Sequence, residues 1–143
     1  MVAEYMFNKA NSGKRLTRRE QRDLDIQIGF LEGIVRRAPE YVDALQILGE
    51  DYMRRGSVEE GLRVDERLAQ LRPDDALVHY NLACSYSLTE QYELAVVCLE
   101  RALSLGFYNF KWLAKEPRLA NLREHRLYKR IRAKVRSMRI KIS

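Results

Sequence analysis

Apolar residues recur every three or four positions through most of the chain, which is the spacing of an amphipathic helix. Before residue 38 the residues that share one helical face are Leu24, Ile28, Leu31, Ile34 and Val35. Thr17 and Glu20 have the spacing of a capping box, so we expect the helix to begin after Thr17. The chain holds only seven Gly and three Pro. This composition favours helices joined by short turns over a β-sandwich with many turns.

The chain contains an internal repeat, because the segment 37–71 aligns without a gap to the segment 71–105. We call the offset between these two segments, from residue 37 to residue 71, one repeat length. Large residues recur as large and small residues as small, in the pairs Pro39 and Pro73, Leu48 and Leu82, Gly49 and Ala83, Tyr52 and Tyr86, and Gly61 and Ala95. Two antiparallel helices approach closely where small residues meet, so we expect Gly49 to face Gly61 and Ala83 to face Ala95. Each unit is predicted to be a helical hairpin.

These positions and this repeat length resemble the tetratricopeptide repeat (TPR) family. The second unit matches its pattern better, with Leu82, Ala83, Tyr86, Tyr92, Ala95, Leu99 and Ala102. The resemblance implies an all-α fold, a short right-handed α-solenoid of antiparallel helix hairpins that ends in a C-terminal capping helix. We expect a mobile arm at 1–16 and a single domain at 17–143. That domain would comprise a half repeat (17–38), two repeats (40–73 and 74–107) and a capping segment (108–143).

Composition and charge bound the function classes. Apolar residues make up 46% and charged residues 32% of 143 residues, as in a folded globular domain. No apolar run is long enough to cross a membrane and no signal sequence opens the chain, so a cytoplasmic protein is expected. Cys84 and Cys98 fall at apolar positions of predicted helices, which favours buried, reduced thiols over a disulfide.

Few residues suggest catalysis or metal binding. His79 and His125 lie on different predicted helices without cysteine or carboxylate at ligand-like spacing, so no metal site and no cofactor are expected. We expect His79 to pack between helices and His125 to be solvated. No phosphate-binding loop or nucleophile elbow is present. The sequence therefore favours a non-catalytic protein.

The TPR resemblance implies a concave groove, lined by the first helix of each hairpin, that binds a peptide or protein segment. The corresponding residues are Asp43, Gln46, Glu50, Arg54, Leu77, Tyr80, Asn81, Cys84, Leu88, Lys111 and Lys115. Some relatives clamp a partner's terminal carboxylate, and Asn81, Lys111 and Lys115 match that pattern. Glu50 would repel such a terminus, so a general peptide groove is favoured over a carboxylate clamp. The same surface could also be a solvated polar face, or could be occupied by the protein's own N-terminal arm.

The end of the chain is strongly basic, with ten Lys and Arg against one acid from residue 118 to 141. Its apolar stripe is Leu127, Ile131, Val135, Met138 and Ile142, and its basic residues include Arg130, Arg132, Lys134, Arg136 and Arg139. This amphipathic helix could cap the solenoid, pair with a partner helix or a second copy, or bind nucleic acid or an anionic membrane surface. The leading hypothesis is a protein-binding adaptor, and the alternative is an accessory protein that acts through this basic helix.

Overall fold

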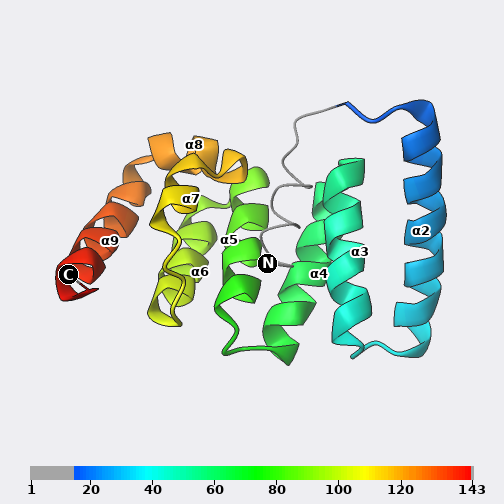
Figure 1. Ribbon diagram of the computed structural model, residues 1–143, viewed down its shortest axis with the longest axis horizontal. Coiled ribbons are helices and arrows are strands. Elements are labelled where there is room, and N and C mark those ends of the chain that lie inside the picture. Colours follow the sequence, from blue (N-terminus) through cyan, green and yellow to red (C-terminus); the bar gives the residue numbers. More distant parts are fainter. Residues whose placement is uncertain (1–14, 143) are drawn as a thin grey trace. The chain divides into compact units, whose positions relative to one another are not determined.

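A computed structural model describes residues 15–142, and every regular element in that range is helical (Figure 1). In chain order these are α2 (Arg18–Arg37), α3 (Val42–Arg55), α4 (Val58–Leu71), α5 (Ala76–Leu88), α6 (Tyr92–Ser104), α7 (Phe110–Lys115), η1 (Pro117–Leu119), α8 (Ala120–Glu124), η2 (Arg126–Tyr128) and α9 (Lys129–Ile142). The expected all-α class is confirmed for this range. None of its helices combines the length and apolarity needed to cross a membrane. Nearly all of the arm expected at 1–16 falls outside the described residues.

Contacts divide the chain into two compact units, the first ending at Leu71 and the second beginning at Arg72. The first unit contains α2, α3 and α4. The predicted capping box is confirmed, because the Thr17 hydroxyl accepts a hydrogen bond from the Glu20 N–H (3.1 Å) and the Glu20 carboxylate accepts one from the Thr17 N–H (2.8 Å). α3 and α4 approach where expected, since a Cβ added to Gly61 would lie 3.7 Å from the Gly49 carbonyl oxygen.

The second unit is organised around α5, which packs against α6 and also contacts η1 and α8. Asp75 starts α5 by accepting hydrogen bonds from the two backbone N–H groups at Leu77 and Val78. Ala83 and Ala95 are fully buried, as expected for small residues in a close helix pair. Because neighbours cover α5 on several sides, even its serines at 85 and 87 are buried.

The first helices of both hairpins end in the same backbone geometry. Gly56 after α3 and Glu90 after α5 have positive φ angles of 87° and 60°. In each case the next residue donates its backbone N–H at 2.8 Å to the carbonyl of Tyr52 or Tyr86. This is the Schellman arrangement, which glycine adopts without strain and glutamate does not. The second hairpin therefore closes with a strained residue where the first has glycine.

The repeat spacing continues past the second hairpin. α3, α5 and α7 begin at Val42, Ala76 and Phe110, so each of these helices starts one repeat length after the one before. α3 has 14 residues and α5 has 13, whereas α7 has only 6. α7 stops because Glu116 adopts an extended conformation (φ −56°, ψ 113°), as residues before proline usually do, and Pro117 follows. The third repeat thus begins at the expected position, but its first helix is less than half as long as those of the two preceding repeats.

α9 does not bury the residues that correspond, one repeat length on, to the buried residues of α6. One repeat length after the buried Leu99 of α6 comes Ala133, which is exposed in α9. Conversely, Ile131 is fully buried, while Val97, its counterpart in α6, is 54% exposed. α9 therefore turns nearly the opposite face inward, and it contacts α6 and η2.

Candidate functional site

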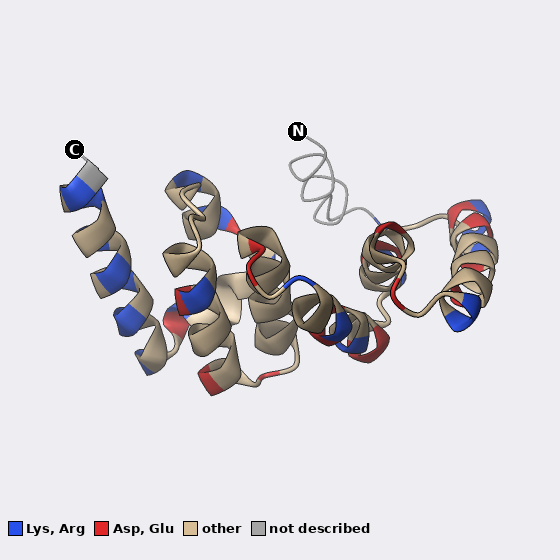
Figure 2. Cartoon of the chain, turned by 90° about the horizontal axis from the view of Figure 1, so that it is seen from below, with Lys and Arg blue, Asp and Glu red and all other residues tan. Residues whose placement is uncertain are grey.

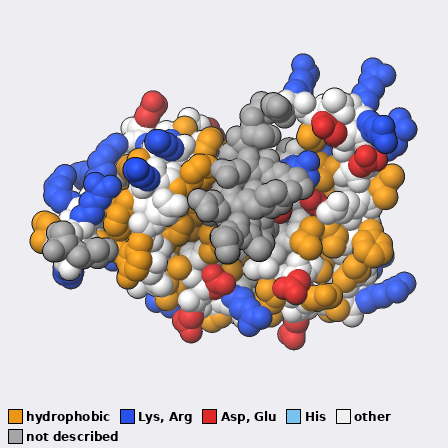
Figure 3. All heavy atoms as spheres, in the orientation of Figure 1, with side chains coloured by type: hydrophobic (Ala, Val, Ile, Leu, Met, Phe, Trp, Pro, Cys, Tyr) orange, Lys and Arg blue, Asp and Glu red, His pale blue; other side chains and the backbone are white. Residues whose placement is uncertain are grey.

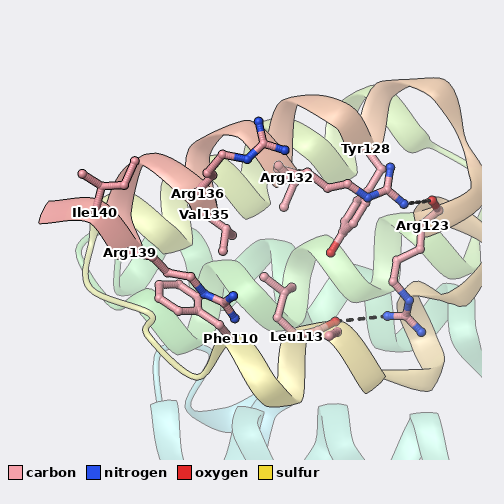
Figure 4. Close-up of a pocket in the computed structure, with 11 residues that line it drawn as sticks. Phe110, Leu113, Arg123, Tyr128, Arg132, Val135, Arg136, Arg139 and Ile140 are labelled. Atoms are coloured by element: carbon pink, nitrogen blue, oxygen red, sulfur yellow. Dashed lines mark hydrogen bonds between the residues drawn. The ribbon is translucent and has the colours of Figure 1, made fainter. Parts of the chain in front are cut away.

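α7 and α9 leave an open cavity of about 490 Å³ between them within the second unit (Figure 4). We call it the α7–α9 groove. Its apolar lining residues are Phe110, Leu113, Ala114, Tyr128, Ile131, Val135 and Ile140. Its charged lining residues are all arginines, namely Arg123, Arg132, Arg136 and Arg139. Among the described residues, the groove thus joins an apolar floor to a cationic rim, and none of those that line it carries a carboxylate.

Helical spacing explains how one face of α9 supplies both apolar and cationic residues to the groove. The α9 residues that line the groove are Ile131, Arg132, Val135, Arg136, Arg139 and Ile140, which recur at intervals of one, three and four on one helical face. The apolar stripe predicted from the sequence overlaps this face only at Ile131 and Val135. Leu127 and Met138 are half-buried and do not line the groove. The side chain of Ile142 lies outside the described part of the chain.

Two of the rim arginines are anchored to the ends of neighbouring helices. Arg123 donates a hydrogen bond to the Leu113 carbonyl (3.1 Å), and Arg132 donates one to the Arg123 carbonyl (2.9 Å). Carbonyls in the last turn of a helix lack intrahelical partners and carry partial negative charge, so cations are favourable there. The Arg132 guanidinium also lies 4.9 Å from the centre of the Tyr128 ring. This end of the groove is therefore held in place by the fold.

At the other end, the Arg139 guanidinium lies 5.4 Å from the centre of the Phe110 ring. Arg136 lies between Arg132 and Arg139 along α9 and is exposed, and no ion pair joins it to another described residue. Figure 2 shows Lys and Arg along the length of α9, and Figure 3 shows exposed hydrophobic side chains beside them. Arg136 is thus the rim residue best placed to meet an incoming anion.

A buried polar cluster within the same unit joins η1 to α5. The Glu116 carboxylate is completely buried, and its Oε1 accepts hydrogen bonds from Tyr80 Oη (3.2 Å), Trp112 Nε1 (3.2 Å) and Arg118 Nη2 (2.8 Å). The Cys84 thiol lies 3.8 Å from the same oxygen. Several donors thus converge on one carboxylate, which compensates for its removal from water.

The protonation states of this cluster follow from its geometry. Burial raises the pKa of the Tyr80 hydroxyl far above its usual value, and the neighbouring Cys84 and Glu116 add to the effect. Burial alone would also raise the pKa of Glu116. The charge of Arg118 and the hydrogen bonds from Arg118 and Trp112 outweigh it and hold that pKa below its usual value. At neutral pH the cluster therefore combines a neutral tyrosine with an ionised Glu116–Arg118 pair.

The structure corrects two of the residues assigned to the peptide groove. Tyr80 and Cys84 were expected to line an exposed surface, but both are 0% exposed and belong to the Glu116 cluster. They are covered because the chain after α7 crosses α5 as η1. Asn81 is half-buried, and its amide oxygen accepts a hydrogen bond from Arg118 (3.4 Å).

The other groove residues keep at least partial access to solvent. Within the first unit, Gln46, Glu50 and Arg54 are half-buried on α3. Within the second unit, Lys111 and Lys115 are exposed on α7. These remaining assignments stay predictions.

The predicted basic tail is divided by the fold. Arg132, Arg136 and Arg139 line the α7–α9 groove, whereas Lys134 is half-buried outside it. Arg130 points to α6 and forms an ion pair with Glu100 (2.5 Å). The tail is thus not a uniform cationic face.

Glu116, Arg118, Arg123 and Phe110 were not among the site residues predicted from the sequence. One signal could have identified Glu116, because it stands one repeat length after Leu82, which in turn stands one repeat length after Leu48. Leu48 and Leu82 are both buried, so the extended repeat would have placed a glutamate in the core. A buried glutamate requires donors nearby, which points to Tyr80, Trp112 and Arg118.

Both histidines contact neighbouring residues of the second compact unit. The His79 Nε2 lies 2.8 Å from the Pro73 carbonyl oxygen. His125, expected to be solvated, is instead half-buried; its Nδ1 accepts a hydrogen bond from the Leu127 N–H and its ring lies 4.8 Å from that of Tyr92. Within residues 15–142, no group of three or more His, Cys, Asp or Glu side chains could hold a metal ion.

No protein-family model matches the chain. Over 79 residues the chain is 32% identical to a chloroplastic protein of Arabidopsis thaliana. The match covers 53% of this chain and 24% of the plant protein, so the chain is similar to about a quarter of a longer protein.

Proposed function

We propose that this chain is a non-catalytic TPR-type adaptor that binds a segment of another protein in the α7–α9 groove. The observation that carries the proposal is the groove itself, because its apolar floor is open to solvent and all four of its charged lining residues are arginines. Hydrophobic and aromatic floors with a few oriented polar groups are typical of binding sites. Arginine is also enriched where proteins bind one another.

The repeat supports the adaptor class. Three helix starts spaced by one repeat length and small residues between paired helices are what a TPR array requires. Repeat arrays present their helices as a scaffold whose exposed side chains select the partner. The exposed Lys111 and Lys115 on α7 would extend such a surface beyond the groove.

Affinity capture tests the proposal. The tagged full-length chain would be incubated with lysate of its source organism at low and high salt, with and without nuclease, and bound proteins would be cross-linked and identified by mass spectrometry. The proposal expects a discrete protein that survives nuclease, cross-links to α7 or α9, and is lost with the exposed-site variant Arg136→Glu. Recovery of the same protein by the parent chain and this variant would contradict a groove-based function.

Binding of an anionic surface through α9 is the second candidate. It is favoured by the composition of α9, which carries seven Lys and Arg residues and no acid. It is disfavoured because Arg130 pairs with Glu100, while Arg132 and Arg139 lie against aromatic rings of the second unit. Capture that disappears on nuclease treatment, or co-sedimentation with anionic vesicles but with no protein, would support this candidate instead.

A further inference from the structure

The kind of segment that fits the α7–α9 groove can be inferred from the third repeat, whose two helices do not pack on each other. In the first two hairpins the second helix packs directly on the first, α4 on α3 and α6 on α5. In the third repeat α7 stops after 6 residues. α9 buries nearly the opposite face from the one that α6 buries at corresponding positions. The apolar surfaces of α7 and α9 are therefore separated by a cavity instead of covering each other.

We propose that this groove binds an acidic amphipathic helix of a partner protein, which completes the packing between α7 and α9. The inference rests on the proposed adaptor function and specifies the class of segment that is bound. Its three parts, namely helical conformation, apolar anchors and acidic flanks, each follow from a separate feature of the groove.

The helical conformation follows from the elements that form the groove. Its walls are helices, whose backbone groups are already paired, so they offer no sheet edge to which an extended peptide could add a strand. Affinity must come from side chains, as in binding of a helix in a groove. The lining residues of α9 run from Ile131 to Ile140, and with Tyr128 of η2 they span about 18 Å at 1.5 Å per residue. This length accommodates roughly three turns of a partner helix.

The apolar anchors follow from the floor. Leu113 and Ile131 are buried at its base, while Val135 is half-buried and Ile140 is 72% exposed. A helix with large apolar residues three or four positions apart would remove Val135 and Ile140 from water. The two aromatic rings of the floor already have guanidinium groups over them, at 4.9 Å for Tyr128 and 5.4 Å for Phe110. These rings are thus not open platforms for stacking nucleic-acid bases.

The acidic flanks follow from the rim. Four guanidinium groups border the floor, and no described residue that lines the groove carries a carboxylate. Guanidinium matches carboxylate in planar, paired hydrogen bonds. Arg123 and Arg132 donate to helix-end carbonyls, which fixes the positions of their charges. A partner with Asp or Glu beside its anchors would therefore meet cations that are already oriented.

Fluorescence anisotropy with defined peptides tests this inference. The probe is a fluorescein-labelled, capped peptide of roughly 16 residues with Leu at helical spacings of three and four and Glu between them. One matched peptide replaces every Glu with Lys, and a second places Pro at the centre. The full chain should bind the acidic helix at least about 10-fold more tightly than either matched peptide, which corresponds to about 1.4 kcal/mol.

Protein variants locate the binding. Arg136→Glu, at an exposed rim position, should weaken binding of the acidic peptide by about 10-fold and strengthen binding of the Lys peptide. Ile140→Ser should weaken both helical peptides, because it removes exposed floor. Arg126→Glu is the matched control, since Arg126 is an exposed arginine of η2 outside the groove. It should change the affinity by less than about 2-fold.

Several results would overturn the inference. Equal binding of the acidic and Lys peptides would remove the acidic requirement, and binding of the Pro peptide would remove the helical one. If Arg136→Glu and Arg126→Glu weakened binding of the acidic peptide equally, the binding would come from diffuse charge attraction and not from the groove. Binding to vesicles of phosphatidylserine with no peptide binding would assign the groove to lipid. If a protein captured from lysate depended on Arg136 through an extended or basic segment, the adaptor function would stand and the acidic helix would be refuted.

Discussion

Replacing Glu116 with glutamine would test how the C-terminal unit is held together. This carboxylate is fully buried, and its partner Arg118 has a side chain only 11% exposed. The substitution keeps the size of the side chain and an oxygen that Tyr80 and Trp112 can still donate to. It removes the negative charge, so the Arg118 guanidinium would be left largely buried without its counterion.

The expected loss of stability is that of a broken buried ion pair. Removing one partner of a buried ion pair costs roughly 3–5 kcal/mol, because the other charge stays buried without compensation. Since glutamine retains an acceptor, we expect the lower end for Glu116→Gln, about 3 kcal/mol. With a typical slope of about 2 kcal/mol per M of urea, the unfolding midpoint would fall by about 1.5 M.

Urea unfolding followed by tryptophan fluorescence is the appropriate assay. Trp112 is the single tryptophan of the chain, and its indole N–H donates to the Glu116 carboxylate, so its emission reports on this cluster. Glu124→Gln is the matched control, because Glu124 is exposed at the end of α8 and should change the midpoint little. A midpoint in Glu116→Gln equal to that of the parent chain would refute the buried ion pair as a source of stability.

The pH dependence gives a second readout of the same pair. The pKa of Glu116 is depressed in the folded state, so its contribution is fully present above the pKa of an unfolded glutamate, about 4.3. The contribution is lost as the pH falls through the lower folded pKa. The stability difference between the parent chain and Glu116→Gln should therefore shrink in acid. A difference that stays constant from pH 7 to about pH 3 would show that charge is not its cause.

Other predictions concern helix ends and the rim of the groove. Glu90→Gly should raise the free energy of unfolding by about 0.5–1 kcal/mol in a urea titration, because glycine adopts φ 60° without strain; a loss of stability would contradict this. Thr17→Ala should cost about 1 kcal/mol by removing the cap of α2, and hydrogen exchange should show faster exchange of the first-turn amides; unchanged protection would argue against the capping box. Arg136→Glu should leave thermal unfolding within about 0.5 kcal/mol of the parent chain while it weakens binding of the acidic peptide, and unfolding of this variant would argue that Arg136 is structural.

The sequence alone determined the helices and much of their pairing. Apolar spacing, the Thr17 cap and the recurrence of small residues are local or periodic signals, and they predicted an all-α chain with Gly49 facing Gly61. Such signals succeed because backbone hydrogen bonding within a helix depends on near neighbours, and because close helix contacts tolerate only small side chains. The repeat also predicted two successive helical hairpins, which the structure has as α3 with α4 and α5 with α6.

Only the tertiary structure decided which side chains the end of the chain buries. Glu116 and Pro117 stop α7, the following segment crosses α5, and Tyr80 and Cys84 are thereby covered instead of exposed. The face of α9 that is buried depends on its contacts with η2 and α6. The helical spacing of apolar residues in so basic a helix is compatible with more than one buried face. The α7–α9 groove arises from this choice, because a cavity depends on contacts between segments distant in sequence.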